Sequence, residues 1–564
     1  MCGLFASYVK NADKKVNKQL NLRALDSLKH RGPDWQGAYS TRDGKVFLGH
    51  NLLSISTSHA HEGRQPAKTD KSVMVFNGEL YNHQDLRQQL TALGIVFDGT
   101  SDTETLLRGI DNLGWGFLDA VEGCWALVLH DLVSGKLFFA RDPLGEKQLI
   151  YKVDPNGLTL ASEAKAIGTV GGPLGLSGER IFSDLVFDFF SNRESTYFNG
   201  LKNCLPGKVY QYDPHQTAPQ VIHTTRLGPN RPVTPLRRTL AHAVSSMVPE
   251  HHAHAVVLSG GLDSSIIASL LKTERLDQPF VAITAAYVDG DNEDLRCAKQ
   301  LANHLGRIDH HILQIGSDDI EQHFEATQHA LEEPLHDQVY VAQYLIYKHI
   351  SNLGLRVAFN GQGADEFWGG YYHHYNLQKL YRLADHEQVI NHFHHIAERR
   401  GLLHLLTRSE IGTLIEHNLA PRWTDSTTLQ NILMEGHLQA MLSHEDKLSM
   451  VSGVEVRLPF LNQELVRHAL DLSNEEKVRH GIEKSPLRAA MKGILLDQIR
   501  LRRKQAFPDA PKTAYLKLPA LQRLAATSGF FSTSDIKHIA QAAPAMEWRM
   551  NAVNAFSGAI ARGI

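Results

Sequence analysis

A glycine- and serine-rich loop between an apolar strand and a helix is the segment that most restricts how this chain can fold. Residues 259–265 read Ser-Gly-Gly-Leu-Asp-Ser-Ser, after the predicted strand Ala255–Leu258 and at the start of a predicted helix over Ser264–Lys272. The two glycines allow a sharp turn that exposes backbone N–H groups. The serines add hydroxyl donors, and the helix N-terminus adds partial positive charge. This first loop therefore predicts a phosphate-binding site.

Strands and helices alternate after the first loop. Strands are predicted at Phe280–Ala286, Asp309–Ile315 and Arg356–Phe359, and helices at about 293–305 and 339–352. Their lengths are those of the strands and helices found in βαβ units. Such alternation predicts a doubly wound parallel sheet, which binds its ligands beyond the carboxyl ends of its strands. After Gly370 we expect a mostly helical chain.

A second loop, residues 360–366, follows the last of these strands and reads Asn-Gly-Gln-Gly-Ala-Asp-Glu. The ends of parallel strands converge, so we expect it to face the first loop. Asp263 would repel phosphate on its own, which indicates that Asp263 and Asp365 share a bridging Mg²⁺. The first loop lacks the Gly-Lys-Ser/Thr of a Walker A motif. It resembles the PP-loop of enzymes that cleave ATP between the α and β phosphates.

Residues 1 to about 190 follow a different pattern. Their short β-rich runs are separated by glycine, asparagine and aspartate turns, and helices are predicted only near 20–30, 83–93 and 103–113. Strands close together in sequence predict stacked antiparallel sheets, hence an α+β domain. Residues 191–232 contain five prolines and are predicted to form the last strands and a linker. Residues 233–564 then form the α/β nucleotide-binding domain with its helical C-terminal part.

Composition narrows the class of protein. The chain has 564 residues, of which 42% are apolar and 21% charged, and its net charge is −3. This balance offers no basic surface for nucleic acid or an anionic membrane, so we expect small-molecule substrates. Four scattered cysteines without a C-x-x-C pair argue against a disulfide framework or a zinc site. Without an apolar run of 18 residues or a signal-peptide pattern, a cytoplasmic location is expected.

Cys2 stands at the second position of the chain. Removal of Met1 would leave a cysteine with both a thiol and an α-amine, and this amine can act as the general base for its own thiol. The alternative is a cysteine without a function near the chain terminus. Cys2 alone does not decide between the two.

Several motifs accompany Cys2-Gly3. They are Lys29-His30-Arg31-Gly32-Pro33-Asp34, Phe76-Asn77-Gly78-Glu79-Leu80-Tyr81-Asn82, Gly99-Thr100-Ser101-Asp102-Thr103-Glu104, Arg141–Lys147, Ser162-Glu163, Glu455–Leu461 and Lys484 with Leu487-Arg488. Together with the first loop they resemble the glutamine-hydrolysing asparagine synthetases of the bacterial B type. This family joins a class II N-terminal-nucleophile (Ntn-hydrolase-like) glutamine amidotransferase domain to a PP-loop synthetase domain. The resemblance extends from Cys2 to about Phe507.

For the N-terminal domain, the resemblance implies that the Cys2 thiolate attacks the side-chain amide of glutamine. Asn77 and Gly78 would form the oxyanion hole, and Glu79 and Asp102 would hold the ammonium group of the substrate. The residues that the resemblance places around glutamine are Leu52, Leu53, Ser54, Ile55, Ser56, Arg64, Asn77, Gly78, Glu79 and Asp102. The ammonia released would cross the interior to the second domain.

For the second domain, the resemblance implies that Mg·ATP activates a carboxylate as an acyl-adenylate, from which ammonia displaces AMP. The positions implied for ATP and pyrophosphate are Leu258, Ser259, Gly260, Gly261, Asp263, Ser264, Ser265, Ile283, Asn360 and Gly361. Asp263 and Asp365 would bind Mg²⁺, and Lys484 would neutralise charge in the transition state. Gln362 occupies the place of a catalytic glutamate in the best-known members.

Some positions depart from the family pattern. Leu52 stands where an arginine usually holds the glutamine carboxylate, and leucine cannot form that charge pair. Either Arg64 replaces it, glutamine binds weakly, or free ammonia is the nitrogen donor. Gln362 and Asn360 replace a glutamate and a serine, and residues 331–338 differ from the expected acceptor-site segment. The acceptor therefore stays open at this point.

Four functions remain to be compared. Conversion of aspartate to asparagine is the first expectation, and the same chemistry on a cell-envelope or natural-product carboxylate is the alternative. A β-lactam synthetase-like cyclase fits less well because those relatives lose the nucleophilic cysteine. A non-catalytic protein would have no reason to keep the motifs of both sites together. Homodimers are common among such relatives, and the sequence leaves the oligomeric state open.

Overall fold

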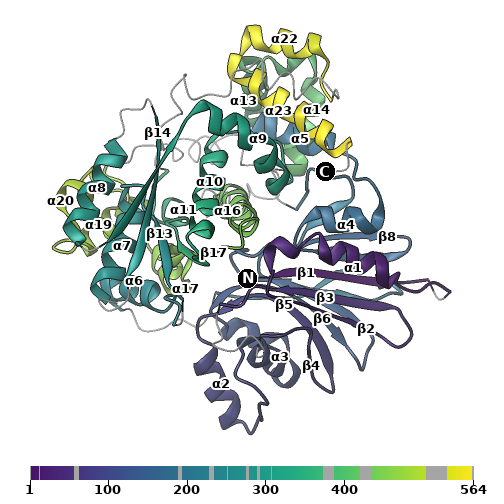
Figure 1. The fold of residues 1–564 in the computed structure, drawn as a ribbon. Helices are drawn as coiled ribbons and strands as arrows, with labels where there is room; N and C mark the ends of the chain where they lie inside the picture. The colour runs from purple at the N-terminus through teal and green to yellow at the C-terminus, as the bar shows by residue number, and fades with distance from the viewer. Residues whose placement is uncertain are drawn as a thin grey trace.

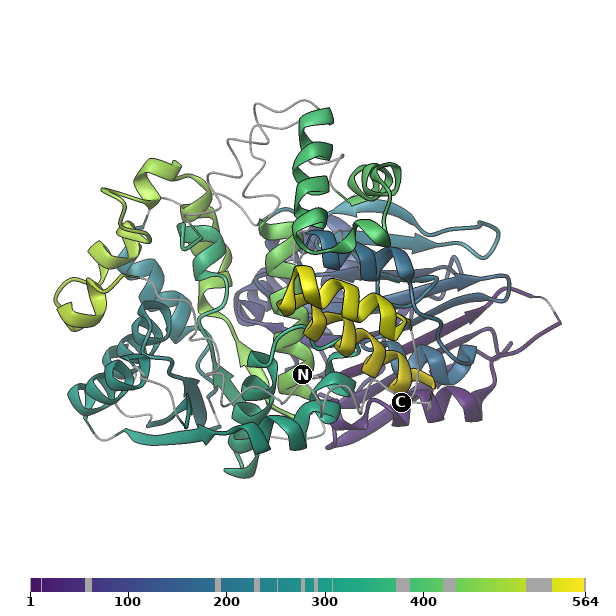
Figure 2. The same cartoon turned by 90° about the horizontal axis from the view of Figure 1, so that it is seen from above.

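The computed structural model describes residues 2–11, 13–55, 63–187, 194–227, 234–250, 252–274, 279–288, 293–306, 308–371, 386–418, 433–503 and 530–561. Two units lie side by side in it, an N-terminal unit with two sheets and an α/β unit with one (Figures 1 and 2). No helix of the described ranges has the length and apolarity needed to cross a membrane.

Two six-stranded antiparallel sheets form the centre of the N-terminal unit. The first has the order β10-β8-β9-β1-β3-β2, with β1 Gly3–Val9, β2 Trp35–Ser40, β3 Val46–Leu52, β8 Ile150–Asp154, β9 Gly157–Ala161 and β10 Leu201–Asn203. The second has the order β12-β11-β7-β6-β5-β4, with β4 Ala67–Lys68, β5 Ser72–Leu80, β6 Gly123–Asp131, β7 Leu137–Arg141, β11 Lys208–Tyr212 and β12 Gln220–Thr224. Alternate residues of β1 and β5, such as Leu4 and Val75, meet in a buried core between the sheets. The predicted stack of antiparallel sheets is confirmed.

Helices cover the outer faces of this stack. The helical segments of the unit are α1 Lys18–Asp26, η1 Lys29–Arg31, α2 His83–Ala92, α3 Asp102–Leu113, η2 Trp115–Ala120, α4 Ala164–Gly171 and α5 Gly178–Phe187. Leu25 of α1 and Ile167 of α4 share a core with Phe5 of β1, whereas Leu106 of α3 packs with Phe76 of β5. Strands β1 and β2 were not predicted from the sequence.

A five-stranded parallel sheet forms the centre of the α/β unit, as predicted. Its order is β15-β14-β13-β16-β17, with β13 His254–Val257, β14 Phe280–Tyr287, β15 Asp309–Ile315, β16 Val357–Phe359 and β17 Glu455–Arg457. The expectation of a mostly helical chain after Gly370 missed β17. Its three residues have too little pattern of their own, and they become a strand because the edge of β16 supplies their hydrogen bonds.

The helical segments of the α/β unit pack around this sheet and extend over the N-terminal unit. They are α6 Leu236–Ser245, α7 Leu262–Glu274, α8 Glu293–Leu305, α9 Ser317–Leu331, α10 Val339–Asn352, α11 Ala364–Trp368, α13 His386–Arg399, η5 Leu402–His404, α14 Arg408–Asn418, η7 Leu433–Leu438, α16 Gln439–Met450, η8 Pro459–Leu461, α17 Gln463–Leu470, α18 Asn474–Lys477, α19 Ser485–Ala490, α20 Asp497–Arg500, α22 Thr533–Ala542 and α23 Pro544–Ala561. Phe393 of α13 and Val553 of α23 share a core with Leu185 of α5, which ties the C-terminal helices to the first unit.

Candidate active sites

Cys2 lies at the start of β1, inside the N-terminal unit and 5% exposed. Its backbone nitrogen donates a hydrogen bond of 2.7 Å to Oδ1 of Asn77, a fully buried residue of β5. Nδ2 of Asn77 has no hydrogen-bond partner among the described residues. A buried donor without an acceptor costs about 1–3 kcal/mol. This amide is therefore suited to bind an oxyanion that forms beside the Cys2 sulfur.

The surroundings of the Cys2 sulfur act on the pKa of its thiol in opposite directions. Burial raises the pKa of the thiol, and a hydrogen bond from the backbone of Leu53 opposes that rise. Gly78 follows Asn77, and a Cβ at this position would come within 2.2 Å of the Cys124 carbonyl oxygen. Only glycine therefore lets β5 run this close to β6. Cys2, which directly precedes β1 of the first sheet, and Asn77 and Gly78, which lie in β5 of the second sheet, were predicted from the sequence to act together, and the hydrogen bond from Cys2 to Asn77 joins the two sheets at this point.

The half-buried Glu79 of β5 and the buried Asp102 of α3 interact electrostatically near this nucleophile. Ser101 caps α3, its Oγ accepting the N–H of Glu104, and this cap places Asp102 at the first position of the helix. Burial raises the pKa of Glu79 to about 8, Arg457 opposes the rise and the charge of Asp102 adds to it. Burial also raises the pKa of Asp102, against the backbone N–H of Leu80. A cation between these carboxyl groups would relieve their repulsion.

The next predicted glutamine-binding residues, 52–55, lie at the end of β3 and directly after it. Leu52, Leu53 and Ile55 are 6%, 4% and 3% exposed, and the N–H of Ser54 donates to Asp34. Ser56, also predicted to bind glutamine, lies outside the described residues.

Arg64 lies close to position 52. Its guanidinium stacks 4.0 Å above the ring of Trp35, and Trp35 is the cross-strand partner of Leu52. Directly opposed residues of an antiparallel pair share one face of the sheet. An exposed arginine therefore stands beside the leucine that replaces the expected arginine.

One fully buried arginine links this site to the second unit. Nε of Arg31 donates to the Cys2 carbonyl at 3.1 Å, Nη1 to Glu163 at 2.8 Å and Nη2 to Asp446 of α16 at 2.8 Å. Arg31 and Glu163 belong to motifs seen in the sequence, but Asp446 was missed. No local pattern marks it, because its partner is 415 positions away.

The first loop forms a compact turn before α7. Oγ of Ser259 lies 3.0 Å from Oγ of Ser264 and accepts the N–H of Gly261. Gly260 has a φ of +79°, and a Cβ there would come within 2.0 Å of the Asp294 carbonyl oxygen. This position therefore requires glycine. Ser265, the last residue of the loop, is fully buried within α7.

The second loop packs against the first, as predicted. A Cβ on Gly361 would lie 2.9 Å from Cβ of Asp263. Nζ of the buried Lys484 lies 2.6 Å from Asp263 and 2.7 Å from Asp365. The two carboxylates predicted to bind metal are thus together, with the lysine between them. Gln362 is half-buried in the same loop.

Asp263 and Asp365 are the side chains on which the predicted Mg²⁺ site depends. Across the described ranges, no group of three or more His, Cys, Asp or Glu side chains could hold a metal ion. Asp263 and Asp365 fit the usual Mg²⁺ arrangement, in which one or two carboxylates, phosphate oxygens and waters complete an octahedron.

The predicted adenosine positions lie at the carboxyl end of the sheet. The N–H of Leu258 donates to the Ile283 carbonyl at 2.8 Å, and the Leu258 carbonyl accepts the hydroxyl of Thr284. Both Leu258 and Ile283 are fully buried. The N–H of Leu258 and the carbonyl groups of Leu258 and Ile283 therefore take part in hydrogen bonds between the end of β13 and β14.

A buried carboxyl group beneath the second loop was missed by the sequence analysis. Glu445 of α16 is 2% exposed, and burial raises its pKa to about 8. It accepts hydrogen bonds from Tyr347, Gln343 and Nδ2 of Asn360, the last at 2.9 Å. Oδ1 of Asn360 accepts the N–H of Gly361. Glu445 thus sets the orientation of Asn360 and the start of the second loop.

The segment at residues 331–338, which departs from the expected acceptor site, packs against the N-terminal unit. The carboxylate of Glu332 accepts the backbone N–H groups of Ala164 and Lys165, at the start of α4. Glu333 pairs with His444 of α16. Glu332 thus connects the two units, whereas Glu333 holds the segment to α16 within the α/β unit.

Comparisons with known proteins agree with this two-site arrangement. A family model described as asparagine synthase matches residues 235–544, and one described as a glutamine amidotransferase domain matches residues 1–222. The chain belongs to the asparagine synthase family. It is therefore an ATP-using, glutamine-dependent carbon–nitrogen ligase of the asparagine synthetase type, which confirms the resemblance seen in the motifs.

Three relatives illustrate the range of this family. Glutamine-hydrolysing asparagine synthetase 3 of Bacillus subtilis is 26% identical over 558 residues, covering 92% of this chain and 88% of the relative. Asparagine synthetase B of Escherichia coli is 29% identical over 416 residues, covering 69% and 68%. A Gibberella zeae protein named amidase chry2 is 29% identical over 406 residues, covering 66% and 59%.

Proposed function

We propose that the chain synthesises asparagine from aspartate, glutamine and Mg·ATP, with AMP and pyrophosphate released. The observation that carries the proposal is the presence of two separate sites on one chain. Cys2 and Asn77 form a nucleophile with an adjacent oxyanion donor, and the two apposed loops with Lys484 form an anion site at the end of a parallel sheet.

In the first half-reaction, the Cys2 sulfur attacks the glutamine side-chain amide and forms a thioester. The α-amine left by removal of Met1 takes the thiol proton and passes it to the leaving nitrogen as ammonia departs. Asn77 supports both roles in this scheme, because Oδ1 holds the nitrogen of Cys2 while Nδ2 donates to the oxyanion. Glu79 and Asp102 hold the substrate ammonium, and Arg64 holds its carboxylate.

In the second half-reaction, an acceptor carboxylate attacks the α-phosphate of ATP and pyrophosphate leaves. Ser259, Gly261 and Ser264 donate to the departing phosphates, and Lys484 offsets the charge that builds up on them. Mg²⁺, held by Asp263 and Asp365 when bound, supplies further charge neutralisation. Ammonia then reaches the acyl-adenylate from the N-terminal unit through the protein interior and displaces AMP.

The acceptor is tested with purified protein, glutamine, Mg·ATP and a panel of carboxylic acids, with AMP and the amide product quantified for each acid. Aspartate is expected to elicit AMP and asparagine in equal amounts. AMP with another acid and none with aspartate would favour the alternative acceptor, to which the changed segment 331–338 and Gln362 point. AMP formation without glutamine or ammonia consumption would indicate a cyclase instead.

A further inference from the structure

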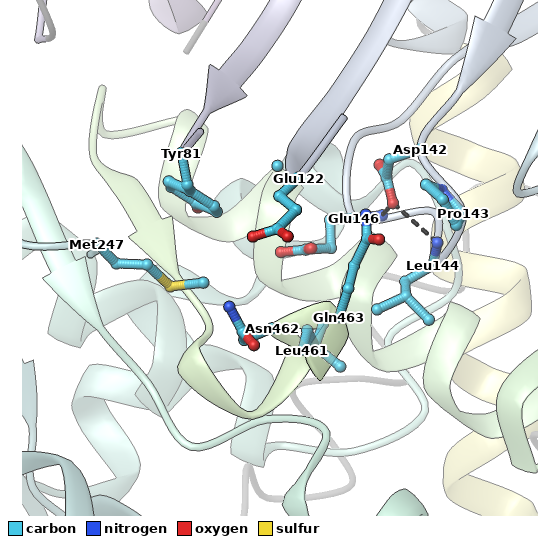
Figure 3. A pocket seen from close by; sticks show the side chains of 11 residues that line it. Tyr81, Glu122, Asp142, Pro143, Leu144, Glu146, Met247, Leu461, Asn462 and Gln463 are labelled. Carbon is cyan, nitrogen blue, oxygen red and sulfur yellow. Dashed lines mark hydrogen bonds between the residues drawn. The ribbon is translucent and has the colours of Figure 1, made fainter. Parts of the chain in front are cut away.

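A small cavity lies where the two units meet (Figure 3). Tyr81, Glu122 and Glu146 line it from the N-terminal unit, and Leu461 and Asn462 line it from the α/β unit. Its volume is about 10 Å³, on the order of the space that one water-sized molecule needs. The cavity can therefore hold a single small species that both units contact.

The lining of this cavity includes chain neighbours of one candidate site and a residue that packs on the other. Tyr81 directly follows Glu79 and Leu80 at the end of β5, so one wall continues from the carboxyl groups beside Cys2. Leu461 forms the opposite wall and packs on the second loop, since a Cβ on Gly363 would come within 2.3 Å of its Cδ2. The cavity thus borders on Tyr81, two positions after Glu79, and on Leu461, which packs on the second loop.

Within the described part of the chain, one oxygen of the Glu146 carboxyl group in this cavity lacks a hydrogen-bond partner. Its side chain lines the space and is only 6% exposed, and its Oε2 has no hydrogen-bond partner among the described residues (Figure 3). Burial raises the pKa of Glu146 well above its usual range, with Asp142 and Glu455 adding to the rise and Lys147 opposing it. Glu122, a second carboxylate, lines the same space. The lining is therefore acidic and lacks a donor for Glu146.

The volume of the cavity and the acidic side chains that line it together restrict which ligand it can bind. A water molecule would fit but would leave the buried Oε2 of Glu146 without a counter-charge, whereas a larger organic cation would not fit. Ammonium has the size of water, one positive charge and N–H donors in every direction. It is also the conjugate acid of the species that the family transfers.

We propose that this cavity is an ammonium site in which Glu146 is the counter-ion and the proton acceptor. The proposal rests on the proposed function. An ammonium N–H proton moves to Oε2 of Glu146, the nitrogen keeps the electron pair of that bond, and neutral ammonia leaves past Leu461 towards the second loop. Ammonia arriving from the N-terminal unit takes its proton from the protonated Glu146 and is held as ammonium. When ammonium enters from solution instead, Glu146 releases the acquired proton to water before the next turnover. The nitrogen can come from bulk solution or from glutamine.

The test replaces the carboxylate with an amide of the same shape, Glu146→Gln. Ammonium-dependent synthesis gives the KM for ammonium, and glutamine-dependent synthesis gives the ratio of glutamate to amide product. Loss of one charge-assisted hydrogen bond should raise one or both quantities by about tenfold. Glu194→Gln, at an exposed carboxylate paired with Lys202, is the matched control and should change neither.

The two measurements, the KM for ammonium and the ratio of glutamate to amide product, identify the source of the nitrogen. A raised KM for ammonium supports entry from solution, and a raised glutamate-to-amide ratio supports delivery from Cys2. Thermal unfolding gives a readout without catalysis: ammonium chloride should raise the midpoint of the parent more than tetramethylammonium chloride does, and Glu146→Gln should abolish that difference.

Several results bear against the proposal. Unchanged KM, ratio and salt difference in a folded Glu146→Gln variant would overturn it. If that variant does not fold, Glu146→Asp keeps the charge but shortens the side chain, and an unaltered ammonium KM there would also overturn it. If the parent makes no amide from either nitrogen source, the proposed function fails, and the salt-dependent melting still decides whether ammonium binds.

Discussion

The contact between Arg31 and Asp446 allows a quantitative test of how the second unit supports the nucleophile. Arg31 is fully buried and holds the Cys2 carbonyl, Glu163 and Asp446 at 2.8–3.1 Å. Asp446→Ala removes one of its two carboxylate partners. Removing one member of a buried ion pair costs about 3–5 kcal/mol, because an uncompensated charge stays behind. Since Glu163 remains, we expect about 3 kcal/mol.

This loss converts into a change in the midpoint of thermal unfolding. Residues 2–224 form the N-terminal unit, and unfolding entropy is about 2.1 cal/mol/K per residue, which amounts to about 0.5 kcal/mol/K for this unit. A loss of about 3 kcal/mol therefore lowers its midpoint by about 6 °C. Asp446→Asn keeps a neutral acceptor for Arg31 and should lose roughly half as much.

The assay combines calorimetry with kinetics. Lys202→Ala breaks an exposed ion pair with Glu194 and should cost less than about 1 kcal/mol. Because Arg31 also fixes the Cys2 carbonyl, Asp446→Ala should lower glutamine hydrolysis more than ammonia-dependent synthesis. A midpoint no lower than that of Lys202→Ala, or an equal loss with both nitrogen sources, would refute the reasoning.

Four further variants test the two sites. Cys2→Ala should abolish synthesis from glutamine and keep synthesis from ammonia; equal loss of both would contradict the nucleophile assignment. Leu52→Arg should lower the glutamine KM by adding a second positive charge, beside that of Arg64, for the substrate carboxylate, and an unchanged or higher KM would count against this. Lys484→Gln should lower synthesis from either nitrogen source by about 10²-fold or more while glutamine hydrolysis persists, as separate assays of the two half-reactions would reveal. Burial raises the pKa of Glu445 to about 8, so its folded form binds a proton more tightly than its unfolded form. The unfolding free energy should therefore fall as the pH rises from about 4.5 through about 8, and Glu445→Gln should flatten that slope in denaturant titrations.

Local patterns were enough to predict the architecture and the close approach of the first and second loops. The change from β-rich runs to strand–helix alternation reflects how each segment buries its apolar side chains, which is a property of neighbouring residues. The two loops were expected to meet because parallel strands end at one edge of a sheet, and Gly361 does lie against Asp263. Capping explains the Ser-Asp-Thr-Glu motif in the same local way.

The missed features depend on partners far away in the sequence. Strand β17 takes its hydrogen bonds from β16, and Glu455–Arg457 alone has too short a pattern to predict it. Asp446 and Glu445 read as polar residues of a helix, yet both are buried, one against Arg31 and the other against Asn360.

The glycines and serines of one short segment predicted the phosphate site, whereas the resemblance of the motifs around Cys2 and Asn77 to a known family predicted the glutaminase chemistry. The burial of charged groups at the boundary between the units followed from folding alone. Desolvation and ion pairing depend on which distant surfaces meet, and no window of the sequence contains that information. The cavity at Glu146 has the same origin, because its walls come from both units.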